Sequence, residues 1–422
     1  MTNIYDRFSG ASAFCKRISI LSLLAVIFSI FFIAAVPAKS SAESQSQPVF
    51  KVVPVSERPF FEDDLDFGQL EEAISGSIAY YQKLPAAKQF FFGKDTFSAG
   101  HLIRSLKRFQ AFIKRKPSQK ELSAFIDQHY HVYAHMKNGA AKPVLFTGYY
   151  EPLLHGSLNQ TEAFRYPVYQ RPGDLVTLDL SDFSDGCSEK MVIGRNDGNT
   201  IVPYYSRQQI EAMAIPGISA LPIAWVNDPV DLFFLQIQGS GKIRLENGTM
   251  INVHYQISNG HPYKSIGKYL IDKKKLSKEK VSMQSIREYL NAHPDEVDEI
   301  FNYNPRYIFF ETVEKGPIGC FNIELTPGRS VALDRQTAPA GALVFIQAEK
   351  PKVNTSDKIQ AWVRFSRFLL NQDTGSAIKG SGRADIFWGS GTYAELAAGY
   401  MKHPGQLYFL VLKPDEMVES CR

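Results

Sequence analysis

Apolar residues recur every three or four positions over much of the first third of the chain, which is the pattern of amphipathic helices. The segments 70–84 and 98–113 both place apolar side chains at positions i, i+3, i+4 and i+7. A third helix is predicted over 118–136, because Ser118 and Glu121 have the spacing of a capping box. We therefore expect a helical region before the pattern changes.

Near residue 142 the pattern becomes one of short apolar runs separated by Gly, Pro, Asn and Asp, which is typical of strands. The stretch 222–257 is predicted to be mainly β, and its Asn247-Gly248 pair lies between two alternating runs, as in a hairpin. A short helix is expected over 205–214. Two more helices are expected over 262–272 and 282–304, and strands over 306–313, 330–349, 359–375, 384–389 and 406–414.

These elements predict a mainly β fold with peripheral helices. The 422 residues are enough for two domains. The composition, 44% hydrophobic and 21% charged, is ordinary for a globular protein. The net charge of +4 is spread thinly, without a dense Lys/Arg cluster, so we do not expect a nucleic-acid partner.

The N-terminus has the order of a secretory signal. An uncharged apolar run, 18–36, follows three basic residues and precedes small residues at Ser40 and Ala42. This arrangement predicts export with cleavage after the run. An uncleaved membrane anchor is the alternative, because nineteen apolar residues approach the length that spans a bilayer. Cys15 lies before the run rather than after it, which argues against lipid anchoring of the lipoprotein type.

Three cysteines remain in the exported part, Cys187, Cys320 and Cys421, so at most one internal disulfide can form. We predict the pair Cys187–Cys320, because Cys421 is in the C-terminal tail; free thiols are the alternative. No CxxC motif occurs, and His131 and His135 are expected to pack on one helix face. We therefore expect no metal site, and nothing suggests a nucleotide, a flavin or any other cofactor.

Three aspartates lie at predicted strand ends near the C-terminus: Asp334, Asp373 and Asp385. A single aspartate in such a place usually caps a turn. Here a glycine-rich loop separates the last two, and a β-barrel brings strand ends together at one mouth. Asp385 is followed by Ile386, Phe387 and Trp388, and apolar surroundings raise the pKa of a carboxyl group. A raised pKa suits a general acid near neutral pH.

Seven blocks of the sequence resemble the membrane-bound lytic murein transglycosylase A family, over residues 146 to 413. They are FTGYYEP (146–152), YPVYQRP (166–172), FLQIQGSGKIRLENG (234–248), SNGHPY (258–263), NYNPRYIFF (302–310), SVALDRQTAPAGA (330–342) and DTGSAIKGSGRADIFWG (373–389). The last block is similar to the small barrel domain named for three aspartates, which match Asp334, Asp373 and Asp385. One departure is the missing cysteine after the apolar run, since many members are outer-membrane lipoproteins.

The resemblance implies an enzyme that cleaves the MurNAc–GlcNAc β-1,4 bond of peptidoglycan and forms 1,6-anhydro-muramyl ends. It implies a double-psi β-barrel with a second β domain inserted, and a glycan groove between them. Asp385 is the implied catalytic residue, supported by Asp373 and Asp334. The residues expected to line the groove are Thr147, Tyr149, Tyr150, Glu151, Gln236, Gln238, Ser240, Lys379 and Gly380.

The expected boundaries are 1–42 for the signal peptide or anchor, 43–143 for the leader and helical region, 144–155 and 296–415 for the barrel, 156–295 for the insert and 416–422 for a tail. Peptidoglycan strands are the expected partner, in the periplasm, with membrane contact only through an uncleaved N-terminal segment. Two alternatives stay open: a non-catalytic wall-binding protein, and a hydrolytic muramidase. The resemblance favours cleavage from chain ends.

Cleavage of the exported precursor is expected near Ala42–Glu43, because small residues at this spacing after an apolar run suit signal peptidase. N-terminal sequencing of the mature protein measures this directly. An intact Met1 in the membrane fraction would establish the anchor instead.

Overall fold

The structure is a computed structural model that describes residues 50–137, 140–180, 191–212, 220–375 and 377–414. The predicted signal segment, Cys187 and Cys421 lie outside these ranges, so the cleavage site and the Cys187–Cys320 bridge stay predictions. Cys320 is exposed and forms no disulfide with another described residue. No helix in the described ranges has the length and apolar character needed to cross a bilayer.

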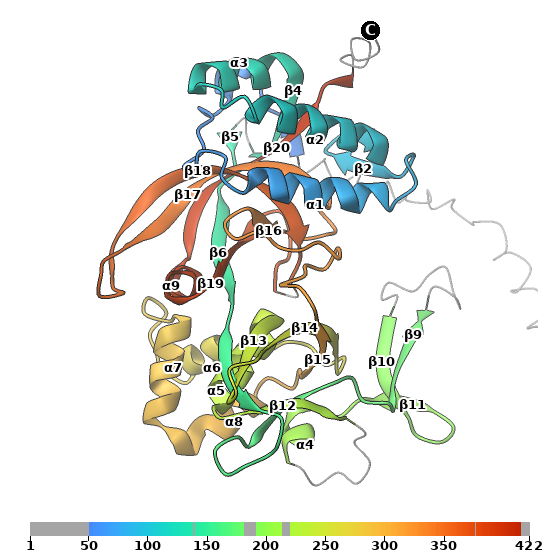
Figure 1. Ribbon diagram of the computed structural model, residues 1–422, viewed down its shortest axis with the longest axis vertical. Coiled ribbons are helices and arrows are strands. Elements are labelled where there is room, and N and C mark those ends of the chain that lie inside the picture. Colours follow the sequence, from blue (N-terminus) through green and yellow to red (C-terminus); the bar gives the residue numbers. More distant parts are fainter. Residues whose placement is uncertain (1–49, 138–139, 181–190, 213–219, 376, 415–422) are drawn as a thin grey trace, which may run out of the picture. The chain divides into compact units, whose positions relative to one another are not determined.

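Six strands close into a barrel, in the upper half of Figure 1. They are β6 (Val144–Glu151), β16 (Ser330–Ala332), β17 (Leu343–Val353), β18 (Ile359–Asp373), β19 (Arg383–Ser390) and β20 (His403–Leu412). Around the ring the order is β20, β17, β18, β16, β19 and β6, and β6 pairs with β20 to complete it. The pairs β16–β18 and β19–β6 are parallel, and the other four are antiparallel.

The N-terminal region extends and covers this barrel. Strand β4 pairs with β20 and with β1, and the apolar faces of the helices join the core of the barrel. Ser98 and Ser118 cap two of the helices, and the capping box predicted at Ser118 and Glu121 is confirmed. The elements are β1 (Phe50–Val52), η1 (Val55–Glu57), α1 (Leu70–Gln82), β2 (Gln89–Phe92), β3 (Asp95–Ser98), α2 (Ala99–Ile113), α3 (Gln119–His129), β4 (Tyr130–Lys137) and β5 (Ala140–Ala141).

The helix predicted over 118–136 is wrong in its second part. Helix α3 ends at His129, and Tyr130 begins β4. Tyr130, Val132 and Tyr133 are strand formers, and the segment gains two rows of backbone hydrogen bonds by pairing with β20 and β1. His131 and His135 therefore lie on a strand, and not on a helix face as expected.

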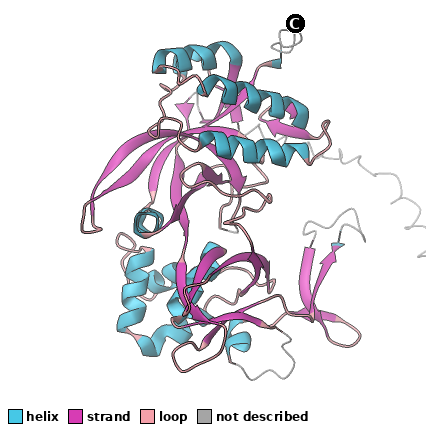
Figure 2. Ribbon diagram, in the orientation of Figure 1, coloured by secondary structure: helices cyan, strands magenta, loops and turns pink. Residues whose placement is uncertain are grey.

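A second, six-stranded sheet lies below the barrel in Figures 1 and 2, with the order β15, β14, β13, β7, β12 and β8. The hairpin predicted at Asn247-Gly248 is confirmed, since it joins β13 to β14. A smaller three-stranded sheet has the order β11, β10 and β9. The strands are β7 (Leu153–Ser157), β8 (Tyr166–Tyr169), β9 (Leu175–Asp179), β10 (Met191–Asn196), β11 (Ile201–Pro203), β12 (Pro222–Val226), β13 (Ser240–Leu245), β14 (Met250–Ser258) and β15 (Ile308–Val313).

Within the stretch predicted to be mainly β, residues 229–238 instead form the helix α5 (Pro229–Gln238). The Asp228 side chain accepts hydrogen bonds from the first turn, Pro229 occupies the first helical position, and Gly239 ends the helix at φ 83°. Apolar side chains surround most of α5, so it has no amphipathic period to reveal it. The helix matters for the site, because its last turn carries Gln236 and Gln238.

The remaining helices surround the second sheet and the barrel (Figure 2). The short helix predicted near residue 205 is confirmed as α4, while the single helix predicted over 282–304 is broken at Pro294. Helix α9 was not predicted, and it packs on β6 and β19. The helices are α4 (Arg207–Glu211), α6 (Ile266–Asp272), α7 (Met283–Ala292), η3 (Pro294–Glu296), α8 (Val297–Asn302) and α9 (Thr392–Tyr400).

The chain passes from the barrel into the second sheet and later returns to the barrel. Strand β6 belongs to the barrel, β7 to β15 lie in or around the other sheets, and the chain returns to the barrel at β16. The boundary expected at residue 296 falls before α8 and β15, and β15 pairs with β14. We propose that the inserted domain extends to residue 313.

A buried ion pair joins the segment before α1 to the barrel. The Arg329 guanidinium is buried and donates to both oxygens of Asp63, at 2.6 and 2.8 Å, and to two backbone carbonyls. Next to it, Asp64 accepts from Arg367 at 2.7 Å. Each buried guanidinium group is paired with a carboxylate, and this pairing offsets the free-energy cost of burying the two charges.

The substitution Asp63→Asn is expected to lower the free energy of unfolding by about 3–5 kcal/mol, because it leaves the buried Arg329 charge without its partner. Urea denaturation at pH 7 measures the loss. Asp66→Asn is the matched control: Asp66 is exposed with φ 48°, a conformation that Asn tolerates, so its effect should stay within about 0.5 kcal/mol. Equal stability of the two variants would contradict the role of the ion pair.

Candidate active site

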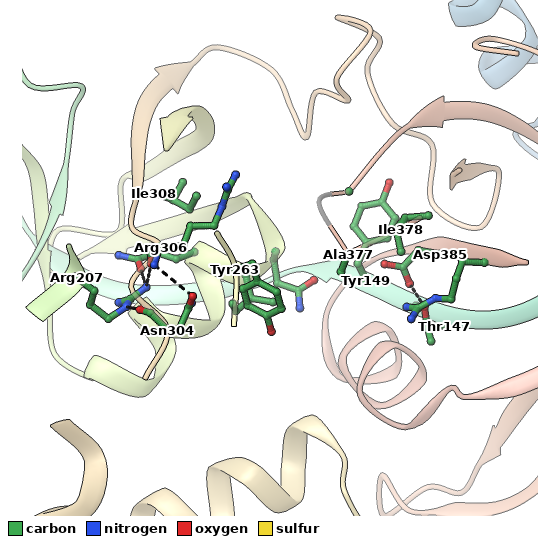
Figure 3. Close-up of a pocket in the computed structure, with 16 residues that line it drawn as sticks. Thr147, Tyr149, Arg207, Tyr263, Asn304, Arg306, Ile308, Ala377, Ile378 and Asp385 are labelled. Carbon is green, nitrogen blue, oxygen red and sulfur yellow. Dashed lines mark hydrogen bonds between the residues drawn. The ribbon is translucent and has the colours of Figure 1, made fainter. Parts of the chain in front are cut away.

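A pocket of about 290 Å³ has one wall from the barrel and one from the second sheet (Figure 3). The barrel contributes Thr147, Tyr149 and Asp385 together with the loop after β18. The other wall comes from the last turn of α5 and the segment 304–308. Five residues predicted for the site line this pocket: Thr147, Tyr149, Gln236, Gln238 and Asp385.

The position of Asp385 follows from the strand order. Strand β16 lies between β18 and β19, and Ala332 is the Cα partner of both Asp373 and Asp385. Two aspartates twelve residues apart in the sequence are thereby brought to one end of the barrel. On β19 the neighbours Ala384 and Ile386 point into the core, so the alternation of the strand turns Asp385 toward the pocket.

Within the described part of the chain, one hydrogen bond holds the carboxyl group of Asp385. The Thr147 hydroxyl of the parallel neighbour β6 donates to it at 2.7 Å. Burial raises the pKa of Asp385 to about 6, since the ionised form loses hydration. The Thr147 hydrogen bond and the Arg383 guanidinium oppose this increase in pKa, while the charge of Asp373 adds to it.

Asp373 is fixed much more firmly. It accepts from the backbone N–H groups of Cys320 and Thr374, at 2.9 and 2.8 Å, and from the Tyr149 hydroxyl at 2.9 Å. Burial raises the pKa of Asp373, and these hydrogen bonds oppose the rise. The pKa of Tyr149 lies well above its usual value through burial and the nearby Asp373 charge, so Tyr149 stays a hydrogen-bond donor.

Asp334 shapes the rim rather than lining the pocket. Its carboxylate accepts from the backbone N–H of Gln336 at 3.0 Å and from that of Gly380 in the glycine-rich loop. Gly380 has φ 75°, a conformation that favours glycine. Lys379 is exposed, and neither it nor Gly380 lines the pocket. Asp334 therefore ties this loop to the barrel.

Besides Lys379 and Gly380, three more of the predicted groove residues lie outside the pocket lining. Tyr150 is buried on the opposite side of β6 from Tyr149, and its backbone N–H donates to Gln238 at 3.1 Å. Glu151 is buried in an ion pair with Lys242 at 2.9 Å. Ser240 begins β13 and is not part of the pocket lining.

The aromatic pair after Asp385 is a packing feature. Phe387 is buried against Tyr149, with ring centroids 5.2 Å apart. Trp388 is buried and packs near Phe365 and Tyr393, with centroids 6.1 and 5.9 Å away. Neither residue lines the pocket, so both contribute to the apolar packing next to Asp385 and not to a ligand-facing wall.

Several pocket residues were not predicted: Arg207, Tyr263, Asn304, Arg306 and Arg383. All but Arg207 lie within the sequence blocks that carry the family resemblance, so those blocks were the available signal. Arg207 is buried, donates to the backbone carbonyls of Asn304 (3.1 Å) and Arg306 (2.8 Å), and bonds the side-chain oxygen of Gln236. These contacts hold the wall opposite Asp385, as Figure 3 shows.

Comparison with known proteins gives a consistent result. The family profile "MltA specific insert domain" matches residues 145–311, and the profile "3D domain" matches residues 329–411. A crystal structure of a membrane-bound lytic murein transglycosylase from Agrobacterium tumefaciens is 30% identical, with a TM-score of 0.70. That alignment covers 86% of this chain and 97% of the Agrobacterium chain. The chain belongs to the membrane-bound lytic murein transglycosylase A family.

Two Escherichia coli comparisons extend this. The membrane-bound lytic murein transglycosylase A of strain K12 is 32% identical over 274 residues, which are 64% of this chain. The match spans 66% of the length of that relative, just under two thirds. The structure of E. coli MltA with bound chitohexaose is 26% identical, has a TM-score of 0.67, and the match covers 87% of this chain and 96% of that chain. Membership of the family confirms the mainly β fold with its barrel.

The substitution Asp385→Asn is expected to raise the melting temperature at pH 8. The folded-state pKa of about 6 exceeds the ordinary value of 3.8, so ionising Asp385 opposes folding. The difference in melting temperature between the variant and the wild type should reach its largest value above pH 6 and decrease as the pH falls toward 3.8. Thermal melts from pH 4.5 to 8 measure it. Asp357→Asn, at the exposed tip of the β17–β18 hairpin, should show no such trend, and a gain independent of pH would contradict the prediction.

Proposed function

We propose that this protein is a lytic transglycosylase that cleaves the MurNAc–GlcNAc β-1,4 bond of peptidoglycan and forms 1,6-anhydro-muramyl ends. The observation that carries the proposal is a single carboxyl group, Asp385, with a pKa near 6 in a pocket between two walls. Among the described residues that line this pocket, no other has a carboxyl group. Ordinary glycosidases place two carboxyl groups around the bond.

One carboxyl group suffices when the substrate supplies its own nucleophile. Asp385 first donates its proton to the glycosidic oxygen as the bond from that oxygen to C1 of the muramyl sugar breaks. The C6 hydroxyl of the same sugar then forms the new bond to C1, and the ionised Asp385 takes the hydroxyl proton. The attack is intramolecular, and good orientation of such reactions lowers the barrier by about 7–11 kcal/mol at best.

The neighbours of Asp385 suit this double role. A proton donor that must also recover a proton needs a pKa near the working pH. Burial raises the pKa, while the Thr147 hydroxyl and Arg383 keep it from rising further. Thr147 also orients the carboxyl group, since its hydrogen bond engages one oxygen and leaves the other for the substrate.

Asp373 is proposed to support the site rather than to act as a second catalytic carboxylate. Three hydrogen bonds, from Cys320, Thr374 and Tyr149, engage its oxygens, so it is poorly placed to activate a water molecule. Through Tyr149 it fixes a side chain of the pocket wall. A hydrolytic muramidase would need a carboxylate that activates a water molecule. Its products would carry hydrated ends, whereas a lytic transglycosylase forms anhydro ends.

Export to the periplasm is part of this proposal. The basic residues and apolar run at the N-terminus support it, and the relatives are named membrane-bound enzymes. Peptidoglycan strands are therefore the proposed partner.

Asp385→Asn is expected to abolish release of anhydro-muropeptides from sacculi while leaving glycan binding nearly intact. Loss of one general acid or base costs about 10²–10⁴-fold in rate, and this residue serves as both. Asp373→Asn should be milder. In the wild type, activity should fall as the pH rises above about 6, because the reaction starts with Asp385 protonated. Mass spectrometry of digested sacculi measures the products, and a pull-down measures binding.

The products also separate the rival functions. Hydrated ends from the wild type would indicate a muramidase, and binding without products would indicate a wall-binding protein. Substantial anhydro product from Asp385→Asn, with deamidation excluded by mass, would overturn the assignment of the proton donor.

A further inference from the structure

Asn304 and Arg306 lie at the end of the pocket away from Asp385 (Figure 3). Gln236 also lines the pocket and contacts Arg207, which lies at the same end. Side-chain oxygens at this end are already engaged within the protein. That of Gln236 accepts from Arg207, and that of Asn304 accepts from the backbone N–H of Arg306 at 3.3 Å. The backbone carbonyls of Asn304 and Arg306 accept from Arg207. What this wall offers a ligand is therefore mainly hydrogen-bond donors.

Arg207 fixes the orientation of the Gln236 amide. A guanidinium group only donates, so the amide oxygen must face it and the Nε2 group must point elsewhere. Gln236 is only 5% exposed, and its Nε2 has no hydrogen-bond partner among the described residues. The Tyr307 hydroxyl interacts with Gln236, but without hydrogen-bonding geometry to Nε2. A buried donor in this state is unfavourable, and an acceptor on a ligand in the pocket would satisfy it.

Arg306 adds charge to the same wall. Among the described residues, its guanidinium has one hydrogen-bond partner, the carbonyl of His261 at 3.3 Å. The remaining N–H groups of its planar fork match a carboxylate better than a single neutral oxygen. Arg383 also lines the pocket, and Asp385 is protonated when the reaction begins, so positive charge is in excess.

We propose that Gln236 and Arg306 bind a carboxylate of the muramyl residue, carried either by its lactyl group or by its stem peptide. This inference rests on the proposed function. Both sugars of peptidoglycan carry an acetamido group, but only the muramyl sugar carries a carboxyl substituent. A carboxylate-binding wall thus distinguishes the two sugars and sets which of the two alternating bonds lies at Asp385.

Binding is measured by calorimetry in the inactive Asp385→Asn background, so that no probe is cleaved. Three probes are compared: peptide-free GlcNAc–MurNAc oligomers, the same strands with stem peptides, and chitohexaose, which has no carboxylate. Adding Arg306→Gln should weaken binding of a carboxylate probe by at least about tenfold, which is about 1.4 kcal/mol, and change chitohexaose binding by less than about twofold. The probe that loses affinity identifies the source: peptide-free strands for the lactyl group, peptide-bearing strands alone for the stem peptide.

A second variant keeps the test decisive. Gln236→Glu preserves the contact with Arg207 but replaces the free donor with an acceptor, so it should also weaken only the carboxylate probes. The matched controls are Gln208→Glu, exposed on α4, and Arg244→Gln, exposed on β13; they make the same charge changes outside the pocket. Neither control should alter any affinity by more than about twofold.

Equal loss for chitohexaose and the muramyl probes, or no loss for any probe, would overturn the carboxylate assignment. Those results would leave formation of anhydro ends by the wild type unaffected. Failure of the proposed function would show differently, as an absence of anhydro products from the wild-type protein.

Discussion

The double pairing of β6 is the constraint on which the site depends. This strand is parallel to β19 on one side and antiparallel to β20 on the other, and so it closes the barrel. The same register sets Thr147 beside Asp385. Beyond Glu151 the chain continues directly into β7 of the second sheet. One strand therefore closes the barrel, orients the carboxyl group and connects the two walls of the pocket.

Asp373 and Asp385, which pair with Ala332 from the strands on either side, differ in the hydrogen bonds that they accept. Asp373 at the end of β18 accepts from three donors among the described residues, two of them backbone N–H groups, and these hydrogen bonds fix its carboxyl group and oppose the increase in pKa that burial causes. Asp385, the third residue of β19, accepts from one hydroxyl group among the described residues and has apolar neighbours in the strand. Strand position thus gives two chemically identical side chains different surroundings, and the proposed proton donor is the one with fewer hydrogen bonds among the described residues.

Periodicity and capping predicted the helices of the N-terminal region, because their apolar faces lie on a core while their other faces meet water. The same logic failed for α5, which is apolar nearly all around, and for β4, where tertiary pairing ends a helix that local pattern would continue. The apolar sequence context of Asp385 predicted a carboxyl group with a raised pKa, and the structure places that carboxyl group in the pocket. The roles of Arg207 and Arg306 were not, since they arise from contacts between segments about a hundred residues apart.

The strand order also has a consequence for the sequence of folding events. Thr147 and Asp385 are 238 residues apart in the chain, and the second sheet lies between them. All strands of that sheet precede residue 314, so the sheet can form before the rest of the barrel is synthesised. Both edges of β6 stay unpaired until β19 and β20 have been synthesised. Long-range pairing of this kind is slow, and an unpaired edge is prone to aggregation until it is covered. The proposed proton donor is thus among the last parts of the barrel to be positioned, and the pocket is complete only when β19 has paired with β6 and β16.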